Sequence, residues 1–322
     1  MKQHSPLLTM GMPVYNEENY IGETIESLLS QTFKDFILII SDNNSLDHTP
    51  EICKYYAEKD KRIVFVRHAE NKGVFFNFKY VLDKANTPFF MWCGGHNRWD
   101  PQFVEKLLPL IQNEDLILVY PQTREIKIDG TLGKIYQEDL TTVKIERPID
   151  RYLYILNHTA EGYLFYGIWK TQMLKNCYFK PVICFDTLIL LRAALLGKFK
   201  HMEDILFFEK VIRTENSENM YRRQISMILG KNFQKIPSTF LLRGQFIFEN
   251  VKMIYKINPR LSVISKLILS TQATYTWIRR FYINPFLVKI LKNLIKILKK
   301  ILPDRTYLSL KDKVKGKIKK YL

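Results

Sequence analysis

Two short apolar segments, joined by an amphipathic one and each followed by a polar loop, constrain the fold of this chain more than any other feature. Residues 7–12 and 36–40 are apolar and have the length of buried parallel strands. Residues 21–33 place apolar side chains at the spacing of a helix face. This order predicts a βαβ unit, and ligands of open parallel sheets bind beyond the carboxyl ends of the strands. The polar loops 12–18 and 41–47 are therefore expected to form one site.

These loops resemble sequence blocks of a known enzyme family. "MPVYNEENYIGETIESLLSQTF" and "ISDNNSLDHTPEIC" are similar to the first two blocks of family 2 glycosyltransferases with the GT-A fold, and "RHAENKGVFFNFKYVLDKA" is similar to the third. A looser similarity through "FYGIWKTQML" and "CFDTLILLRAALLGKF" extends the resemblance to roughly residues 7–205. The resemblance implies an α/β fold in which helices flank a Rossmann-like, mostly parallel central sheet.

Three regions are expected along the chain. Residues 1–120 form the nucleotide-sugar-binding half of the GT-A domain, and residues 121–245 form its acceptor-binding half. Residues 246–322 form a helical, basic, membrane-associating extension. At 322 residues and 47% hydrophobic composition, the chain is long enough for one large domain or two small ones.

Local patterns within the second region predict three elements. Asp129-Gly130 lies between residues 125–128 and 133–136, an arrangement typical of a β-hairpin. Residues 168–175 and 185–196 carry helical patterns, and the second pattern ends at a glycine, as helices often do.

The resemblance assigns the donor site to three of the motifs. Asp42, at the end of the second strand, is expected to accept hydrogen bonds from the nucleobase, although its carboxylate could equally cap an Asx turn. Asn44 is expected to order the same loop. The other nucleotide-sugar-binding candidates on the first and third motifs are Pro13, Tyr15, Glu17, Lys72, Gly73 and Asn77.

The metal motif departs from the family pattern. Relatives carry an Asp-X-Asp triplet after the strand at 88–92, and this chain has Gly95, His96 and Asn97 there. Asn97 offers one carbonyl oxygen to a hard cation, and His96 suits Mn²⁺ or Zn²⁺ better than Mg²⁺. A divalent cation, Mn²⁺ or Mg²⁺, is therefore a doubtful cofactor, although Asn97 and His96 remain the candidate metal ligands. Gly95 and His96 are also candidates for contact with the nucleotide sugar.

Basic side chains offer a second way to neutralise the leaving diphosphate. Lys72 and Arg98 both lie next to the predicted donor loops in the sequence. Fixed positive charges stabilise a developing anion, which is the role that a metal would otherwise fill.

The resemblance also implies a catalytic base. The family places a carboxylate after the acceptor loop, where this chain has Asp186, and Glu161 is the reserve candidate. Asp186 would take the proton of the acceptor hydroxyl during an inverting attack on the anomeric carbon. It also stands where a helix N-cap belongs, and the helix dipole is expected to lower its pKa.

Positive charge is concentrated at the C-terminal end. The formal net charge is +17, and residues 284–322 hold eleven Lys and one Arg against two Asp, a net charge of +10. On a helical projection the lysines of this segment oppose a continuous apolar face, which is typical of a helix that lies in a headgroup interface. Lysines interrupt the apolar run too often for it to span a bilayer. The alternative is that the apolar face packs on the protein or on another subunit.

Other features bear on partners and location. The basic residues are not interleaved with stacking aromatics, which argues against a nucleic-acid partner. The first residues show no signal-peptide pattern, and the four cysteines show no metal or disulfide spacing. We therefore expect a cytoplasmic protein, peripheral on the inner face of a bacterial membrane.

Three functions compete. The first is an inverting glycosyltransferase that moves a sugar from a UDP- or GDP-linked donor to a hydroxyl of a glycan or lipid-linked acceptor in cell-surface polysaccharide synthesis. The second is a catalytically impaired subunit that binds nucleotide sugars or glycans in a biosynthetic complex. The third is a related nucleotidyltransferase. The donor sugar, nucleotide, acceptor, linkage and oligomeric state, including a homo-oligomer, stay open.

Overall fold

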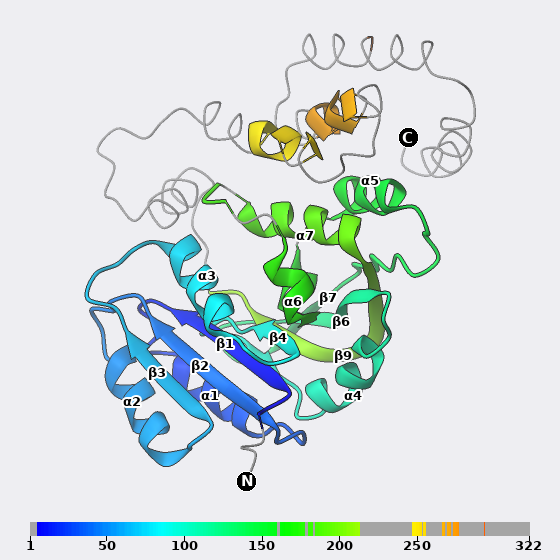
Figure 1. Cartoon of the computed structure of the whole chain (residues 1–322). Coiled ribbons are helices and arrows are strands. Elements are labelled where there is room, and N and C mark those ends of the chain that lie inside the picture. The colour runs from blue at the N-terminus through cyan, green and yellow to red at the C-terminus, as the bar shows by residue number, and fades with distance from the viewer. Residues whose placement is uncertain are drawn as a thin grey trace. The chain divides into compact units, whose positions relative to one another are not determined.

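The computed structural model divides into two compact units, Met1–Leu242 and Arg243–Leu322. It describes residues 5–159, 162–177, 180–182 and 184–212 of the first unit, and of the second it describes 247–252, 254–255, 266–267, 269–271, 273–276 and 293. Glu161 and, except for residue 293, the predicted amphipathic segment 284–322 lie outside the described residues. The labelled helices and strands of Figure 1 all belong to the first unit.

The first half of this unit alternates strands and helices, as its sequence predicts. Its elements are β1 (Leu8–Val14), α1 (Ile21–Leu29), β2 (Phe36–Asp42), α2 (Thr49–Lys59), β3 (Ile63–Arg67), α3 (Val74–Lys84) and β4 (Phe89–Trp92). The second half is less regular. Its elements are β5 (Arg98–Trp99), α4 (Phe103–Ile111), β6 (Leu116–Ile126), β7 (Leu132–Tyr136), α5 (Pro148–His158), the 3₁₀ turn η1 (Tyr163–Tyr166), β8 (Ile168–Lys170), α6 (Thr171–Lys175), α7 (Phe185–Leu196) and β9 (Lys198–Lys210).

One mixed sheet carries all of these strands, in the order β3-β2-β1-β4-β8-β6-β9-β5, with β7 paired to β6. The strands β3, β2, β1 and β4 are parallel, as are β6 and β9. The short strand β8 runs antiparallel to both of its neighbours, and β5 runs antiparallel to β9. The expectation of a mostly parallel sheet is therefore wrong for the second half, because β8 inserts between β4 and β6 in the opposite direction.

The alternation of side chains along β1 explains the layers of Figure 1. Leu8 and Met10 belong to the core cluster that also contains buried side chains of α1, α2 and α4. Gly11 points to the opposite face, where a Cβ would come within 2.8 Å of Phe90 and Val81. Only a residue without a side chain lets α3 pack this closely on β1. The helices α6 and α7 lie on the same side of the sheet as α3 (Figure 1).

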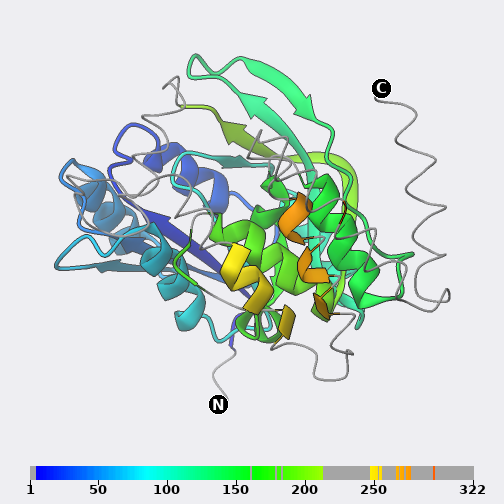
Figure 2. The ribbon, with the colours of Figure 1, turned by 90° about the horizontal axis from the view of Figure 1, so that it is seen from above.

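Two local predictions are confirmed and one is wrong. The β6–β7 hairpin forms, with Gly130 in a left-handed conformation at φ 81°, and it projects from the sheet in Figure 2. The helix α7 forms over the predicted residues. The pattern at 168–175 starts as a strand, because Ile168 and Trp169 are fully buried between β4 and β6, and becomes helical only at Thr171.

Candidate functional site

The strand register brings three side chains into one row at the edge of the sheet. Val14 of β1 pairs with Asp42 of β2, and Asp42 pairs with Arg67 of β3. The carboxyl ends of the three strands therefore end level with one another. The loops that follow β1 and β2 leave the sheet side by side, as expected from the βαβ pattern.

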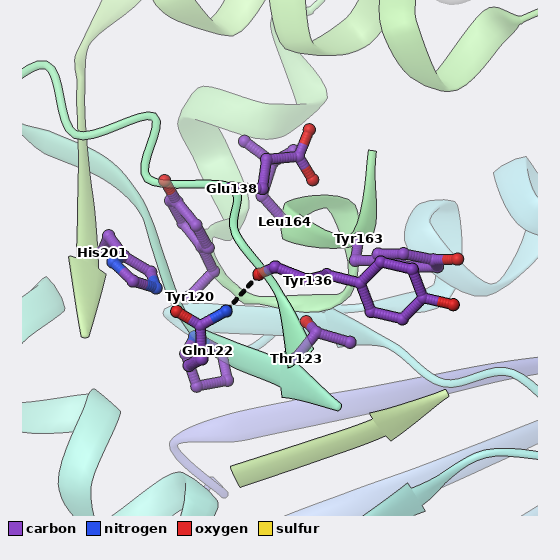
Figure 3. A pocket seen from close by; sticks show the side chains of 9 residues that line it. Tyr120, Gln122, Thr123, Tyr136, Glu138, Tyr163, Leu164 and His201 are labelled. Carbon is purple, nitrogen blue, oxygen red and sulfur yellow. Dashed lines mark hydrogen bonds between the residues drawn. The ribbon is translucent and has the colours of Figure 1, made fainter. Parts of the chain in front are cut away.

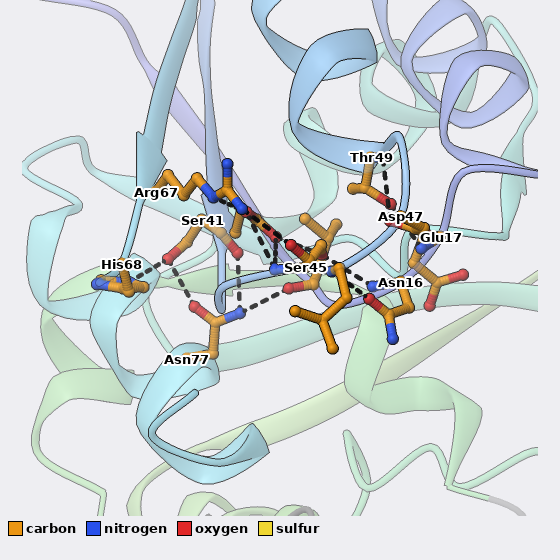
Figure 4. A network of polar contacts seen from close by, with 12 residues as sticks. Asn16, Glu17, Ser41, Ser45, Asp47, Thr49, Arg67, His68 and Asn77 are labelled. Carbon is orange, nitrogen blue, oxygen red and sulfur yellow. Dashed lines mark hydrogen bonds and ion pairs between the residues drawn. The ribbon is translucent and has the colours of Figure 1, made fainter. Parts of the chain in front are cut away.

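Hydrogen bonds join these two loops directly (Figure 4). The backbone N–H of Asn16 donates to Ser45 Oγ at 2.9 Å, and the N–H of Leu46 donates to Asn16 Oδ1 at 2.9 Å. The N–H of Glu17 donates to Thr49 Oγ1 at 2.8 Å. Asn16 and Asn44 both have left-handed backbones, at φ 54° and 64°, which asparagine tolerates better than most residues. The site edge is thus held in one shape before any ligand binds.

Asp42 lies fully buried at the centre of this edge. Its Oδ1 accepts the backbone N–H of Ser45 at 3.1 Å, and its Oδ2 lies 3.3 Å from Arg67 Nε. Burial raises the pKa of Asp42, while the Ser45 hydrogen bonds and the Arg67 charge oppose that rise. The bond from Ser45 also closes the local turn that was the alternative role for Asp42, so the carboxylate orders its own loop.

Arg67 is the first residue of the third motif but was not among the predicted site residues. Its guanidinium is 46% exposed, pairs with Asp42 and donates from NH2 to the Ser45 carbonyl oxygen at 2.9 Å. It is the accessible cation of this cluster, next to a carboxylate that faces inward. Its position at the end of the third parallel strand, level with Asp42, is the feature of the sequence that could have indicated it.

Asn77 ties α3 to the strand ends. Its Nδ2 donates to the carbonyl oxygen of Ser41 at 2.8 Å and to that of Val14 at 3.3 Å, and its side chain is buried. The Ser41 hydroxyl donates to Asn77 Oδ1 at 2.6 Å. His68 Nε2, 2.9 Å from the same hydroxyl, is therefore the donor in the bond between His68 and Ser41. The geometry makes Asn77 a positioning residue for the edge.

The N-terminus of α3 is fixed beside the same loops. The N–H of Lys72 donates to Asn43 Oδ1 at 3.0 Å, and Gly73 precedes the helix at φ 88°, a conformation that favours glycine. The side chain of Lys72 is 43% exposed, with Nζ 4.0 Å from Glu70. A helix N-terminus and an exposed lysine together favour an anion at this point.

Two further predicted residues lie on the β1 side of the edge. Pro13 is buried within β1, and Tyr15 is half-buried in the loop that follows. The side chain of Glu17 points to the loop after β4, where its two oxygens lie 3.1 and 3.2 Å from His96 Nδ1. Glu17 and His96 therefore form a pair across the edge.

The residues at the metal position do not fit the cation site that the fold family implies. Asn97 is 1% exposed, its Oδ1 accepts the N–H of Lys210 at 3.1 Å, and its Nδ2 has no hydrogen-bond partner in the described part of the chain. Gly95 has no side chain, and a Cβ there would lie 2.9 Å from Glu17 Cγ. Within the described ranges no three His, Cys, Asp or Glu side chains form a metal-binding group. A hard cation needs several oxygen ligands, and the single side-chain oxygen of this loop is already bonded to Lys210.

Arg98 is less available than its sequence position indicates. Its guanidinium lies 3.9 Å from Glu23, and the buried ammonium of Lys210 binds the other oxygen of the same carboxylate. Glu23 thus offsets part of the positive charge near the 95–97 loop. Lys72 and Arg67 are the better candidates for contact with an anion.

Asp186 lies in the first turn of α7, partly buried. Its Oδ1 accepts the N–H of Thr187 at 2.7 Å. Burial raises the pKa of Asp186 by more than the backbone N–H groups at the start of α7 lower it, so the net direction is opposite to the expected one. Phe185 packs against Phe75 and Phe78 of α3, with ring centroids 5.4 and 5.6 Å apart. This contact places the start of α7 next to the start of α3.

Comparison with known proteins identifies the family and the fold. The family model described as Glycosyl transferase family 2 matches residues 9–198. TuaG of Bacillus subtilis, provisionally assigned as a teichuronic acid biosynthesis glycosyltransferase, is 28% identical over 131 residues, which cover 41% of this chain and 52% of TuaG. The match spans only 61% and 55% of the length of two other curated relatives.

Solved structures share the fold at low sequence identity. The crystal structure of S. aureus TarS 1-349 in complex with UDP-GlcNAc has a TM-score of 0.61 at 16% identity, covering 92% of this chain and 82% of TarS. The mannosyltransferase PcManGT from Pyrobaculum calidifontis in complex with GDP-Man and Mn²⁺ has a TM-score of 0.50 at 15% identity, covering 95% of this chain and 84% of PcManGT. The central sheet and its flanking helices are thus GT-A-like.

Proposed function

The chain belongs to glycosyl transferase family 2, and we propose that it moves a sugar from a UDP- or GDP-linked donor to a hydroxyl of a glycan or lipid-linked acceptor in bacterial cell-surface polysaccharide synthesis. The observation that carries this proposal is the row of Val14, Asp42 and Arg67 at the carboxyl ends of three parallel strands, with the N-terminus of α3 beside it. Open parallel sheets bind nucleotides at this edge.

The donor is held by its base and its diphosphate. Asp42 and Tyr15 take the nucleoside, and Arg67 pairs with the buried carboxylate and offers a guanidinium of its own. The first turn of α3 and Lys72 take the diphosphate, because both present positive potential. Related enzymes bind a divalent cation, as PcManGT does with Mn²⁺, but the 95–97 loop does not fit one.

Asp186 is the base of the transfer step. It takes the proton of the acceptor hydroxyl as that oxygen forms a bond with the anomeric carbon. The bond from the anomeric carbon to the diphosphate oxygen breaks on the opposite face, which gives inversion, and the diphosphate leaves with the electron pair. A raised pKa suits this role, since a weakly acidic carboxyl is a stronger base. Glu161 stays the reserve candidate.

The polysaccharide setting rests on relatives. TuaG is provisionally assigned to teichuronic acid biosynthesis, and TarS binds UDP-GlcNAc. The described residues contain no helix that is long and apolar enough to cross a membrane. The proposal includes three regions: a donor-binding half at 1–120, an acceptor-binding half at 121–245 and a membrane-associating region at 246–322. The last of these would attach the protein to the inner face of the membrane.

A thermal-shift screen with UDP- and GDP-linked sugars tests it. A ligand present at 100 times its Kd stabilises the folded state by about 2.7 kcal/mol, enough for a clear rise in Tm. We expect one nucleotide class to raise Tm, and slow release of the matching nucleoside diphosphate in its presence. No shift with any nucleotide sugar would contradict the proposal.

A catalytically impaired binding subunit is the second candidate, favoured by the loss of both metal-binding carboxylates at residues 95–97. Such a subunit would show the same Tm shift. It would release no nucleoside diphosphate with any acceptor.

A further inference from the structure

The second half of the sheet holds a small pocket far from the Asp42 row in sequence. Its volume is about 10 Å³, which is room for about one water molecule. Its lining is rich in aromatic and uncharged polar side chains (Figure 3). The lining residues come from β6, the end of β7 and the loop after it, η1 and β9, and they are Tyr120, Pro121, Gln122, Thr123, Tyr136, Glu138, Tyr163, Leu164 and His201.

Two tyrosines form one wall of this pocket. The ring centroids of Tyr136 and Tyr163 are 4.4 Å apart, and their rings are tilted by 54°. Tyr136 is buried, whereas Tyr163 is partly exposed. A partly exposed tyrosine ring offers an apolar face to a ligand.

The opposite wall contains a buried nitrogen without a partner. The His201 side chain is 7% exposed, and its Nε2 makes no hydrogen bond within the part of the chain that is described. Its Nδ1 lies 3.8 Å from Asp139. A buried polar atom without a hydrogen bond destabilises the folded state. We therefore expect a water or a ligand hydroxyl to bind His201 Nε2.

The neighbouring polar groups are held in place by the backbone. Gln122 Nε2 donates to the Tyr136 carbonyl oxygen, which leaves Gln122 Oε1 as an acceptor (Figure 3). Tyr120 Oη accepts the N–H of Leu140 at 2.7 Å, so its own proton is available for donation. Glu138 Oε1 accepts the N–H of Gly162 at 3.3 Å. Tyr120, Gln122 and His201 therefore lie together on one side of the pocket and offer both a donor and an acceptor (Figure 3).

The turn η1 places this pocket next to the transfer site. Tyr163 lines the pocket, and at the other end of the turn the Tyr166 ring lies 3.9 Å from the place a Cβ would take on Gly94. Gly94 opens the loop with His96 and Asn97. Three residues of 3₁₀ turn span about 6 Å, roughly the length of one sugar residue.

We propose that this pocket is a subsite for the glycan acceptor, which binds a hydroxyl of the sugar that neighbours the acceptor residue while Tyr163 covers that sugar's ring. The inference rests on the proposed transfer function. The lining has no Lys or Arg and includes the carboxylate of Glu138, so a phosphate is disfavoured and an uncharged polyol fits. Mixed donors and acceptors beside an aromatic face match a sugar hydroxyl and its ring.

Saturation-transfer NMR with free disaccharides of hexoses and N-acetylhexosamines tests the subsite. The samples contain saturating UDP or GDP, and calorimetry measures the nucleotide Kd on each protein. We expect wild type to bind a disaccharide and Tyr163→Ala and His201→Phe each to weaken it by about tenfold, the scale of one ring contact or one hydrogen bond. Tyr163→Phe keeps the ring and is expected to lose less.

Tyr55→Ala is the matched control, because Tyr55 is an exposed tyrosine on α2. It should leave both ligands unaffected, and the two pocket variants should keep the nucleotide Kd within about twofold. Nucleotide binding without disaccharide binding, or pocket variants that bind the disaccharide as wild type does, would overturn the subsite alone. Failure to bind any nucleotide would overturn the proposed function and the subsite with it.

Discussion

Asp42 is a buried carboxyl whose pKa is raised by burial, and two neighbours oppose that rise. Ser45 donates two hydrogen bonds to it, and the Arg67 guanidinium lies 3.3 Å away. A carboxylate that accepts from a nucleobase N–H must be held rigidly. At the scale of single residues, the pairing of Asp42 with Arg67 and the raised pKa of Asp186 are therefore the features to test.

Replacing Arg67 with Ala should destabilise the protein most at neutral pH. We expect a loss of about 1–2 kcal/mol at pH 7, below the 3–5 kcal/mol of a fully buried pair because Arg67 is 46% exposed. Burial already raises the pKa of Asp42, and removal of Arg67 raises it further. In the variant, folded Asp42 then holds its proton more tightly than unfolded Asp42 does. The loss of stability caused by Arg67→Ala therefore becomes smaller as pH falls towards 4.

Urea unfolding at pH 7 and at pH 4.5 measures this difference. Lys54→Ala is the control, since Lys54 forms an exposed pair with Glu58 on α2 and its removal should cost less than about 1 kcal/mol. A loss for Arg67→Ala that is equal at both pH values would show that the pairing does not govern Asp42.

Replacing Asp186 with Asn should lower turnover by about 10²–10⁴-fold and leave the donor Kd unchanged, because the amide keeps the size of the side chain and cannot take a proton. Since burial raises the pKa of Asp186, the acid limb of the kcat/KM profile in wild type should lie above the ordinary carboxyl value of 3.8. Rate and calorimetric measurements check both points. Turnover within a few-fold of wild type would move the role of base to another residue, Glu161 first.

At the scale of elements, short connections set the position of the site. The loop 94–97 turns its Asn97 side chain inward to the N–H of Lys210, and η1 joins the pocket to that loop. Gly167 ends η1 where the backbone passes β6, and a Cβ there would lie 2.4 Å from the Val119 carbonyl oxygen. Both connections depend on close backbone contacts.

Chelation should leave most of the activity intact, because the only side-chain oxygen of residues 94–97 is bonded to the N–H of Lys210. Nucleoside diphosphate binding should also have the same Kd with Mn²⁺ and with EDTA. Assays and calorimetry in both buffers check this. Complete loss of activity in EDTA that micromolar Mn²⁺ restores would show that the protein or its donor completes a metal site.

Gly167→Ala should destabilise the protein by about 1–3 kcal/mol, since the opposing atom belongs to the backbone of a central strand and cannot move aside. Gly22→Ala is the matched control. Gly22 lies within α1, where the nearest side-chain atom is 3.7 Å from an added Cβ, and alanine favours a helix by about 1 kcal/mol. Thermal unfolding should separate the two, and equal Tm values would contradict the close contact at Gly167.

At the scale of the whole molecule, the charge is uneven. Residues 284–322 contribute +10 of the formal +17, and their sequence predicts an amphipathic helix. The described candidates for donor binding and catalysis all lie before residue 205. The two tasks of sugar transfer and membrane attachment are thus expected to be separable along the chain.

Deleting residues 284–322 should release the protein from anionic vesicles and leave nucleotide binding unchanged. Each lysine near an anionic surface contributes about 1 kcal/mol, and salt screens this within about 8 Å at physiological ionic strength. High salt should therefore weaken, without abolishing, the sedimentation of the whole chain with vesicles. A truncated protein that unfolds, or a whole chain that stays in the supernatant at low salt, would indicate that the apolar face packs on protein.

The sequence by itself determined the βαβ start, the loops that carry Asn16 and Asp42, the β6–β7 hairpin, α7 and the family. Periodicity and turn residues are local signals, and these elements are set by burial and turn geometry over a few residues. Tertiary structure alone decided the antiparallel insertion of β8, the pairing of Arg67 with Asp42 and the bond between Asn97 and Lys210, which are 113 residues apart. Such contacts depend on strand register, and register follows from how separate segments pack together, which no local pattern encodes.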